Sequence, residues 1–253
     1  MFFRKCYKYI NFNDYNMEPR DIHKLPTDGY LVLPLSMSRL SDGKDQSAKD
    51  CYDIIKYFEK KVSRVGIDFI FLYTNGLYYN NEESALSVRK RINMSMIEHK
   101  NKILQLVIRS KKYITQAMHF IPWDFIILNS SQYQGYYQKL INLKNTDKNF
   151  LKLLQEGLNG RPETEANLNF LIEEIIVSHL IRQKLIDFPK TLVRNDTFRL
   201  IVYPGTYLKG DLYQWKKKIL PQTQNSTNKI NPYYASHYNF DKKVLYNFDE
   251  LNI

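Results

Sequence analysis

The stretch Tyr30-Leu-Val-Leu-Pro-Leu-Ser36 decides the fold of this chain. Its apolar residues predict a buried strand, and the polar segment 36–45 that follows predicts a loop. A second apolar run lies at 67–73, after a helical pattern over 48–65 in which four apolar residues recur at helical spacing: Cys51, Ile54, Ile55 and Phe58. Strands that are apolar throughout are typical of a parallel sheet whose two faces are covered by helices.

The same alternation continues along the chain. Apolar spacing predicts further helices over 83–112, 133–142, 148–158 and from Thr164 to about 185, and further strands over 116–121 and 198–203. Strands that alternate with helices indicate an α/β fold. We therefore predict a Rossmann-like parallel sheet with helices on both faces, in a catalytic domain that spans residues 30–220.

Length and composition set the broad class. The chain has 253 residues, of which 43% are hydrophobic and 25% charged, so it can build a sizeable core. We expect an irregular segment over 1–29 and a loose polar tail over 221–253. Two cysteines, Cys6 and Cys51, exclude a disulfide framework, and the longest apolar runs are too short to span a bilayer. We therefore expect a cytoplasmic protein with no secretory signal and no membrane partner.

The charge of the chain is positive and concentrated. Lys and Arg number 37 against 26 Asp and Glu, a formal net charge of +11. One stretch carries +7, which leaves +4 for the rest of the chain, because only Glu98 opposes eight basic residues there: Arg89, Lys90, Arg91, Lys100, Lys102, Arg109, Lys111 and Lys112. Such a run is either a solvated helix face or a contact with a polyanion. Its concentration on one helix favours a nucleic-acid or other anionic partner.

Familiar catalytic motifs are absent from the sequence. It contains no Gly-rich phosphate loop, no Gly-x-Ser-x-Gly elbow and no His-Glu-x-x-His. The five histidines are scattered, and none pairs with a cysteine at metal-ligand spacing. We therefore expect neither nucleotide nor zinc chemistry, and no cofactor or metal.

A few side chains remain as candidates for chemistry. Ser36 ends the first strand, at the edge where α/β sheets bind ligands, and is either a nucleophile or a loop residue. Glu173 and Glu174 interrupt an apolar helix, so one of them must face the buried side, where a carboxylate is costly unless it is paired or functional. Tyr203 ends the last strand, either with its hydroxyl at the same edge or as an ordinary strand aromatic.

The order of these features is more specific than any one of them. The chain carries in succession Leu33-Pro34-Leu35-Ser36, Tyr73-Thr74, the basic stretch 89–112, Trp123-Asp124, Tyr133, Asp147-Lys148-Asn149-Phe150, Phe170-Leu171-Ile172-Glu173-Glu174 and Tyr203-Pro204-Gly205. This ordered set, over residues 30–220, resembles the tRNA-dependent cyclodipeptide synthase family. The Tyr-Pro pair resembles the subgroup of that family with proline after the last catalytic tyrosine.

The resemblance implies a fold, an activity and a set of roles. The domain would be similar to the catalytic domain of class I aminoacyl-tRNA synthetases but would not bind ATP. Ser36 would receive the first aminoacyl group, Glu174 would hold the aminoacyl ammonium and move protons, and Tyr203 would support the second transfer and the cyclisation. Glu173 would lie outside the site. The eight basic residues would contact aminoacyl-tRNA, the substrate of the reaction.

The substrate pocket is expected at the end of the first strand. Val32 and Pro34 would form apolar walls, which suggests an apolar first amino acid such as Leu or Phe. Arg39 occupies a position that varies in the family, three residues after the serine. Phe170 would contact the substrate beside Glu174.

Three departures from the family pattern matter. Phe170 stands where the family has a catalytic tyrosine, so Tyr136 or Tyr137 would have to supply the hydroxyl. Pro34 stands where glycine is usual, and Ser38 becomes the nucleophile if the alignment shifts by two residues. Two other functions therefore stay open: an aminoacyl-tRNA-dependent transferase to another acceptor, and a catalytically impaired tRNA-binding relative. We expect a monomer in each case.

Overall fold

The structure is a computed structural model of the chain. It describes residues 28–44, 46–61, 66–75, 85–110, 117–158, 160–186, 199–203, 208–222, 236–239 and 244–247.

A six-stranded sheet in the order β3-β2-β1-β4-β5-β6 organises the fold. Its strands are β1 (Asp28–Leu35), β2 (Gly66–Tyr73), β3 (Met118–Pro122), β4 (Arg199–Tyr203), β5 (Ser236–Asn239) and β6 (Val244–Asn247). The first five are parallel to their neighbours, and β6 is antiparallel to β5. Leu35 pairs with Tyr73, and Tyr73 pairs with Pro122, so β1, β2 and β3 all end at the same level.

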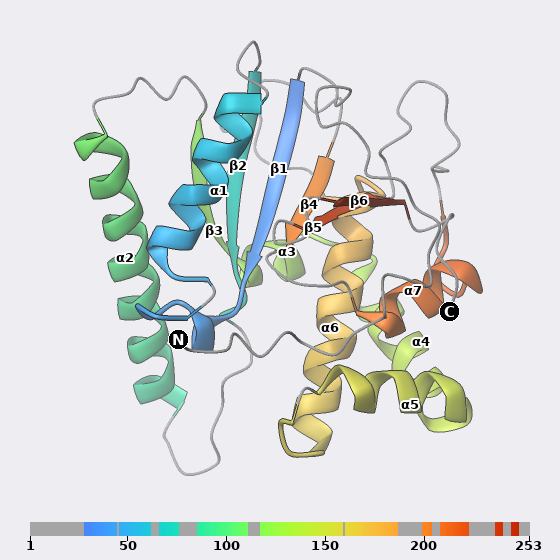
Figure 1. Ribbon diagram of the computed structural model, residues 1–253. Coiled ribbons are helices and arrows are strands. Elements are labelled where there is room, and N and C mark those ends of the chain that lie inside the picture. The colour runs from blue at the N-terminus through green and yellow to red at the C-terminus, as the bar shows by residue number, and fades with distance from the viewer. Residues whose placement is uncertain are drawn as a thin grey trace.

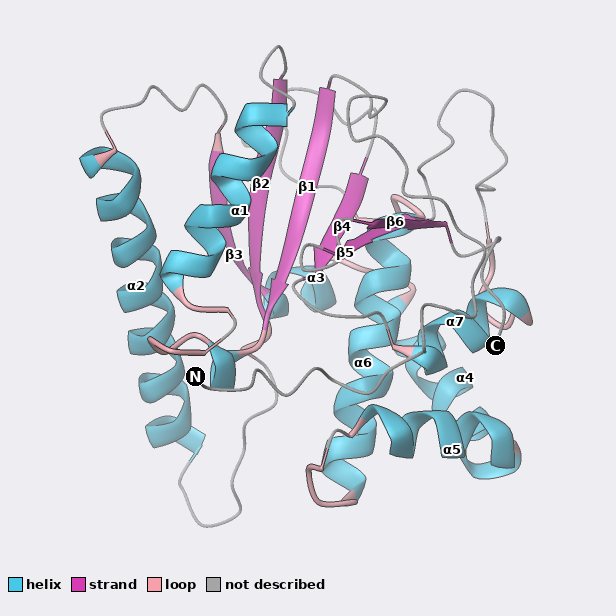
Figure 2. Ribbon diagram, in the orientation of Figure 1, coloured by secondary structure: helices cyan, strands magenta, loops and turns pink. Residues whose placement is uncertain are grey.

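Helices cover both faces of this sheet, as the sequence predicted (Figures 1 and 2). On one face lie α1 (Ala48–Lys61) and α2 (Ala85–Arg109). On the other face lie α3 (Trp123–Leu128), α4 (Tyr133–Thr146), α5 (Lys148–Gly157), α6 (Glu165–Arg182) and α7 (Lys209–Lys216).

Two hydrophobic cores hold these layers together, and β1 contributes to both. Leu31, Leu33 and Leu35 pack with α1 and α2, whereas Tyr30 and Val32 pack against the helices of the other face. All five side chains are fully buried. Successive strand residues point to opposite faces, which is why a strand buried on both sides has no polar position and reads as a continuous apolar run.

Side-chain caps begin two of the helices, α6 and α5. Thr164 precedes α6, and its hydroxyl accepts a hydrogen bond from the Asn167 amide at 3.2 Å, as the sequence predicted. Asp147 precedes α5 and accepts from the amides of Asn149 and Phe150. The Tyr213 hydroxyl of α7 donates to the same carboxylate at 2.6 Å, so one aspartate both begins α5 and joins it to α7.

The structure corrects the sequence analysis at three places. Two short helices, α3 and α7, were not predicted. The segment 221–253, expected to be a loose polar tail, contributes β5 and β6 to the sheet. Their sequences, Ser-His-Tyr-Asn and Val-Leu-Tyr-Asn, contain no long apolar run. Their strand character comes from pairing with β4 and with each other, a long-range contact that local sequence does not reveal.

Candidate active site

Ser36 lies directly after β1, at the carboxyl edge of the sheet, and is half-buried. Its backbone begins the short 3₁₀ turn Met37–Arg39, in which the Arg39 amide donates to the Ser36 carbonyl at 2.9 Å. The Ser36 amide donates to Oε1 of Gln46 at 2.6 Å. The serine therefore has a defined backbone position at the edge where the sequence predicted it.

The ends of the neighbouring strands are joined beside this serine. Both the amide and the hydroxyl of Thr74 donate to the Leu35 carbonyl, at 2.9 and 3.0 Å. The next residue, Asn75, donates from its side chain to Asp124 at 2.8 Å and accepts from the Asp124 amide at 3.3 Å. These contacts join the ends of β1, β2 and β3 into one polar rim.

A protonatable pair lies close to this rim. Glu173 of α6 is half-buried and accepts a hydrogen bond from the hydroxyl of Tyr133, on α4. The pKa of Glu173 is raised to about 7: burial is the largest cause, the Tyr133 bond opposes it, and the nearby charge of Asp124 adds to it. Burial, followed by the Glu173 charge, raises the pKa of Tyr133. A carboxyl group with a pKa near neutrality can both accept and release a proton at physiological pH.

This pair changes the expectation for the two glutamates. Glu173, which we expected outside the site, has the carboxyl group that faces Tyr133 and Asp124. Glu174 is half-buried beside it. The sequence indicated that one of the two glutamates in the apolar run 168–181 must face the buried side. It did not say which one, and only the resemblance to the family favoured Glu174.

Phe170 is packed rather than open. Its side chain is 6% exposed, its ring centroid lies 6.0 Å from that of Trp123, and the Arg161 guanidinium lies 5.3 Å above it. Of the two tyrosines proposed to replace its missing hydroxyl, Tyr136 faces His179. Tyr137 stacks on Tyr133, and burial, followed by the charge of Glu173, raises the pKa of its hydroxyl. The Tyr133 hydroxyl, by contrast, donates to Glu173, a contact that the sequence did not predict.

Other predicted substrate residues occupy different surroundings. Val32 is fully buried in the core on the α6 side, Pro34 is buried two residues further along β1, and Arg39 is half-buried in the 3₁₀ turn. Tyr203 ends β4 at the same edge as Ser36. The side chains of Tyr203 and Ser38 lie outside the described residues, so their roles stay predictions.

The predicted basic helix is present as α2, which lies outermost on its face of the sheet (Figure 1). Its exposed cationic residues are Arg89, Lys90, Arg91, Lys100 and Arg109. Lys102 is half-buried and forms ion pairs with Asp42 at 3.1 Å and Glu98 at 3.0 Å. Lys111 and Lys112 lie outside the described residues. Six of the eight basic residues therefore lie on one helix, most of them in contact with solvent.

The described residues also bear on metal binding and on membrane spanning. They contain no group of three or more His, Cys, Asp or Glu side chains arranged to hold a metal ion. None of their helices combines the length and the apolar character that crossing a membrane requires.

Comparisons with known proteins bear on the fold. No protein-family model matches the chain, and no curated protein matches it. A cyclodipeptide synthase (CDPS) from Staphylococcus haemolyticus matches with a TM-score of 0.50 at 13% identity, over 78% of this chain and 86% of its own. A CDPS from Fluoribacter dumoffii matches with a TM-score of 0.50 at 16% identity, over 77% and 84%.

A third match comes from a Mycobacterium tuberculosis protein, with a TM-score of 0.48 at 13% identity, over 72% of this chain and 76% of that one. Its description relates cyclodipeptide synthetases to type I tRNA synthetases.

The sheet and its serine edge define this chain as an α/β protein of the Rossmann-like class. More specifically, it has the fold of the cyclodipeptide synthases, which the ordered sequence motifs predicted.

Proposed function

We propose that this protein is a tRNA-dependent cyclodipeptide synthase, which joins two aminoacyl-tRNAs into a diketopiperazine through an aminoacyl ester on Ser36. One observation carries the proposal. In a chain with the fold of cyclodipeptide synthases, a serine ends the central strand β1 at the carboxyl edge, where its backbone is held by Gln46 and Thr74 anchors the preceding residue.

The proposed chemistry needs no external source of energy. An aminoacyl-tRNA is already an activated ester, so Ser36 Oγ attacks its carbonyl, the bond from that carbon to the tRNA ribose oxygen breaks, and a proton passes to the departing tRNA hydroxyl. The amine of a second aminoacyl-tRNA then attacks the Ser36 ester and forms a peptide bond, which releases the serine. Ser36 Oγ then attacks the dipeptidyl ester on the second tRNA, the bond to the ribose oxygen of that tRNA breaks, and a proton passes to the departing hydroxyl. The free amine of the dipeptidyl group attacks the new Ser36 ester, which closes the ring and frees the serine.

The two glutamates would have different roles, one in binding the ammonium group and one in accepting protons. Glu174 would bind the aminoacyl ammonium, as the family pattern implies. Glu173, with a pKa near 7, would accept the proton that each attacking amine has to lose. The Tyr133 hydroxyl, bonded to Glu173, would supply the phenol that Phe170 lacks. Tyr203, at the end of β4, would support the second transfer.

The basic face of α2 would bind the tRNA. Six cationic side chains on one helix can contact phosphates and position the tRNA without reading its sequence. The apolar end of β1 at Val32 and Pro34 would favour an apolar first amino acid. The protein would act in the cytoplasm, where charged tRNA is available.

Product analysis tests the proposal. The full chain is produced in bacteria, and extracts are compared by mass spectrometry with those of cells producing Ser36→Ala. A diketopiperazine that requires Ser36 is the expected result. A linear aminoacylated acceptor would instead identify a transferase.

One observation favours a second candidate function. Phe170 is packed between Trp123 and Arg161 without a hydroxyl, at the position of the family's catalytic tyrosine. A tRNA-binding relative with little catalysis would fit this packing. It predicts tight tRNA binding through α2 together with no product and no acylated Ser36.

A further inference from the structure

A buried polar cluster lies between α2, β2 and the segment that leads into α1, and the proposed chemistry does not use it. His99, on the inner side of α2, is 2% exposed. Its Nδ1 lies 2.9 Å from the Tyr73 hydroxyl and its Nε2 lies 3.0 Å from the Gln46 carbonyl oxygen. The Cys51 sulfur lies 3.9 Å from the same Nε2. Both ring nitrogens therefore have named polar neighbours, and the Ser47 backbone also bonds the ring.

The partners fix the protonation of this ring. A carbonyl oxygen can only accept, so Nε2 must carry the hydrogen that bonds Gln46, and Nδ1 accepts from the Tyr73 hydroxyl. Burial, aided by the charge of Lys102, lowers the pKa of His99. The ring is thus neutral at physiological pH, and both of its nitrogens serve a structural contact.

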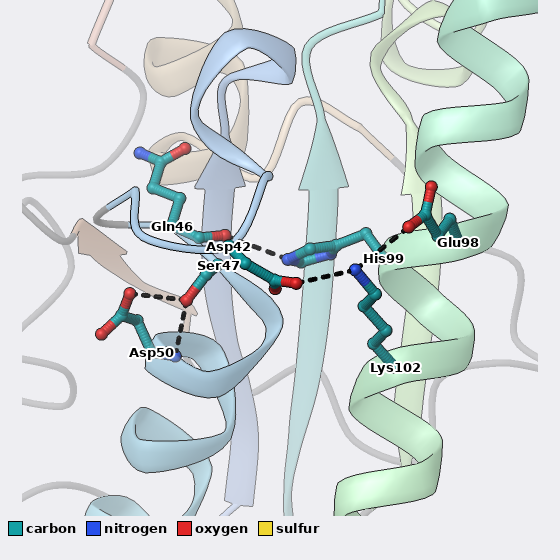
Figure 3. A network of polar contacts seen from close by, with 7 residues as sticks. All are labelled: Asp42, Gln46, Ser47, Asp50, Glu98, His99 and Lys102. Atoms are coloured by element: carbon teal, nitrogen blue, oxygen red, sulfur yellow. Dashed lines mark hydrogen bonds and ion pairs between the residues drawn. The ribbon is translucent and has the colours of Figure 1, made fainter.

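Gln46 connects this histidine to the nucleophile. The side chain is 1% exposed, and its Oε1 accepts from the Ser36 amide at 2.6 Å. Its backbone is held on one side by His99 and is followed directly by Ser47, whose hydroxyl caps α1 through Asp50 (Figure 3). One residue therefore bonds both the inner side of α2 and the backbone of Ser36.

A second contact joins the same two segments at the surface. Lys102, three residues after His99, pairs with Asp42 at 3.1 Å (Figure 3). Exposed ion pairs of this kind contribute little to stability. The buried contacts at the Gln46 carbonyl, from His99 at 3.0 Å and from the Cys51 thiol at 3.7 Å, therefore constrain this segment more than the surface ion pair does.

We propose that His99 is a positioning residue for Ser36: it holds Gln46, and the side-chain amide of Gln46 holds the backbone of the serine. This inference rests on the proposed function, in which Ser36 is acylated. A nucleophile on a loop residue must keep its geometry within a fraction of an ångström, and a displacement of about 1 Å can cost about a hundredfold in rate. The helix that presents the basic face would thus also set the position of the serine.

Single-turnover acylation of Ser36 by aminoacyl-tRNA tests this role in the full-length protein. His99→Leu removes the bonds of the ring to Tyr73 and to the Gln46 carbonyl and should lower the saturating acylation rate by about ten- to a hundredfold, with the Kd for tRNA changed less than twofold. His99→Gln keeps a donor that can reach the Gln46 carbonyl and should recover most of the rate. Asn93→Ala, at an exposed position on the same helix, is the matched control and should acylate at the wild-type rate.

A double-mutant cycle tests whether His99 acts through Gln46. Gln46→Met leaves the Ser36 amide without its acceptor and should lower the rate as His99→Leu does. If the two residues act in one chain of contacts, the double variant should be no slower than the slower single variant, because coupled effects do not add. Multiplied effects in the double variant would overturn the proposal. A His99→Gln variant that is as slow as His99→Leu would overturn it too.

Hydrogen exchange at the Ser36 amide gives a readout that does not need activity. Exchange at this amide should rise at least tenfold in both His99→Leu and Gln46→Met, with the global melting transition kept. If the wild-type protein forms no acyl-enzyme, the proposed function fails, yet faster exchange in both variants would still support the link from His99 to Ser36.

Unchanged exchange in His99→Gln, together with faster exchange in Gln46→Met, is the result expected if only the bond to the Gln46 carbonyl matters. Unchanged exchange in Gln46→Met would overturn the link, whether or not His99→Leu folds.

Discussion

Replacing Glu173 by glutamine tests the site with one substitution. Burial raises the pKa of this carboxyl from an ordinary 4.5 to about 7. Between those values the native protein keeps a proton that the unfolded chain has released. The free energy of unfolding therefore falls as pH rises through this window and stays low above pH 7. Glu173→Gln removes the ionisable group and with it that loss of stability.

The size of the effect follows from the shift. One pKa unit corresponds to about 1.4 kcal/mol, so the rise to about 7 sets an upper limit of about 3 kcal/mol. The carboxyl is only half-buried, and solvent screening lowers the expected gain to about 1–2 kcal/mol at pH 8. In a chain of this size that corresponds to a melting temperature higher by roughly 2–8 °C. At pH 4 both states are protonated, and the gain should disappear.

Thermal unfolding followed by circular dichroism between pH 4 and 8 measures this difference. Glu163→Gln, an exposed position before α6, removes the same charge and should show no gain that depends on pH. Acyl transfer by Glu173→Gln should fall at least tenfold. The variant should therefore be more stable and less active than the wild type. This combination is expected for a functional group whose burial lowers the free energy of unfolding. A variant that is no more stable at pH 8 than at pH 4, relative to wild type, would refute the account of Glu173.

Three further variants, one of them a triple substitution, address the rest of the proposed site. Arg91, Lys102 and Arg109 changed together to Ala should leave the fold intact and reduce the log–log salt slope of tRNA binding by roughly 2–3; an unchanged affinity and slope would place the tRNA elsewhere. Phe170→Tyr should leave diketopiperazine yield equal or higher, since it restores the family hydroxyl, and an unfolded protein on calorimetry would show that the packing against Trp123 has no room for it. Tyr133→Phe removes a bond that lowers the pKa of Glu173, so that pKa should rise and the acid limb of the pH–rate profile should move to higher pH. An acid limb at the same pH would show that Tyr133 takes no part in the reaction.

The sheet was largely predictable because its central strands are buried on both faces. Tyr30 and Val32 serve one core while Leu31 and Leu33 serve the other, so the apolar run has no gaps. Thr164 marked the start of α6 for an equally local reason, the hydroxyl that accepts the Asn167 amide. By contrast, β5 and β6 depend on pairing with a strand far away in sequence, and their own residues carry no comparable signal.

The site was predictable where it follows from a strand end and unpredictable where it depends on contacts between helices. The position of Ser36 at the carboxyl edge was predictable because it directly follows β1, whereas its role stays a prediction. The bond from Tyr133 to Glu173 joins α4 to α6, and no periodicity in either helix points to it. His99 was one of several scattered histidines in the sequence, and its role emerges only when α2 brings it onto the Gln46 carbonyl.

The acylation of Ser36 tests the central claim most directly. The purified protein is incubated with aminoacyl-tRNA, quenched in acid and digested, and the peptide that contains Ser36 is measured by mass spectrometry. The account predicts a mass increase of one aminoacyl group on Ser36, absent in Ser36→Ala and retained in Ser38→Ala. A modification that survives in Ser36→Ala and disappears in Ser38→Ala would show that the nucleophile lies two residues further on. An unmodified peptide from folded, tRNA-bound protein would contradict the claim that this chain is a covalent cyclodipeptide synthase.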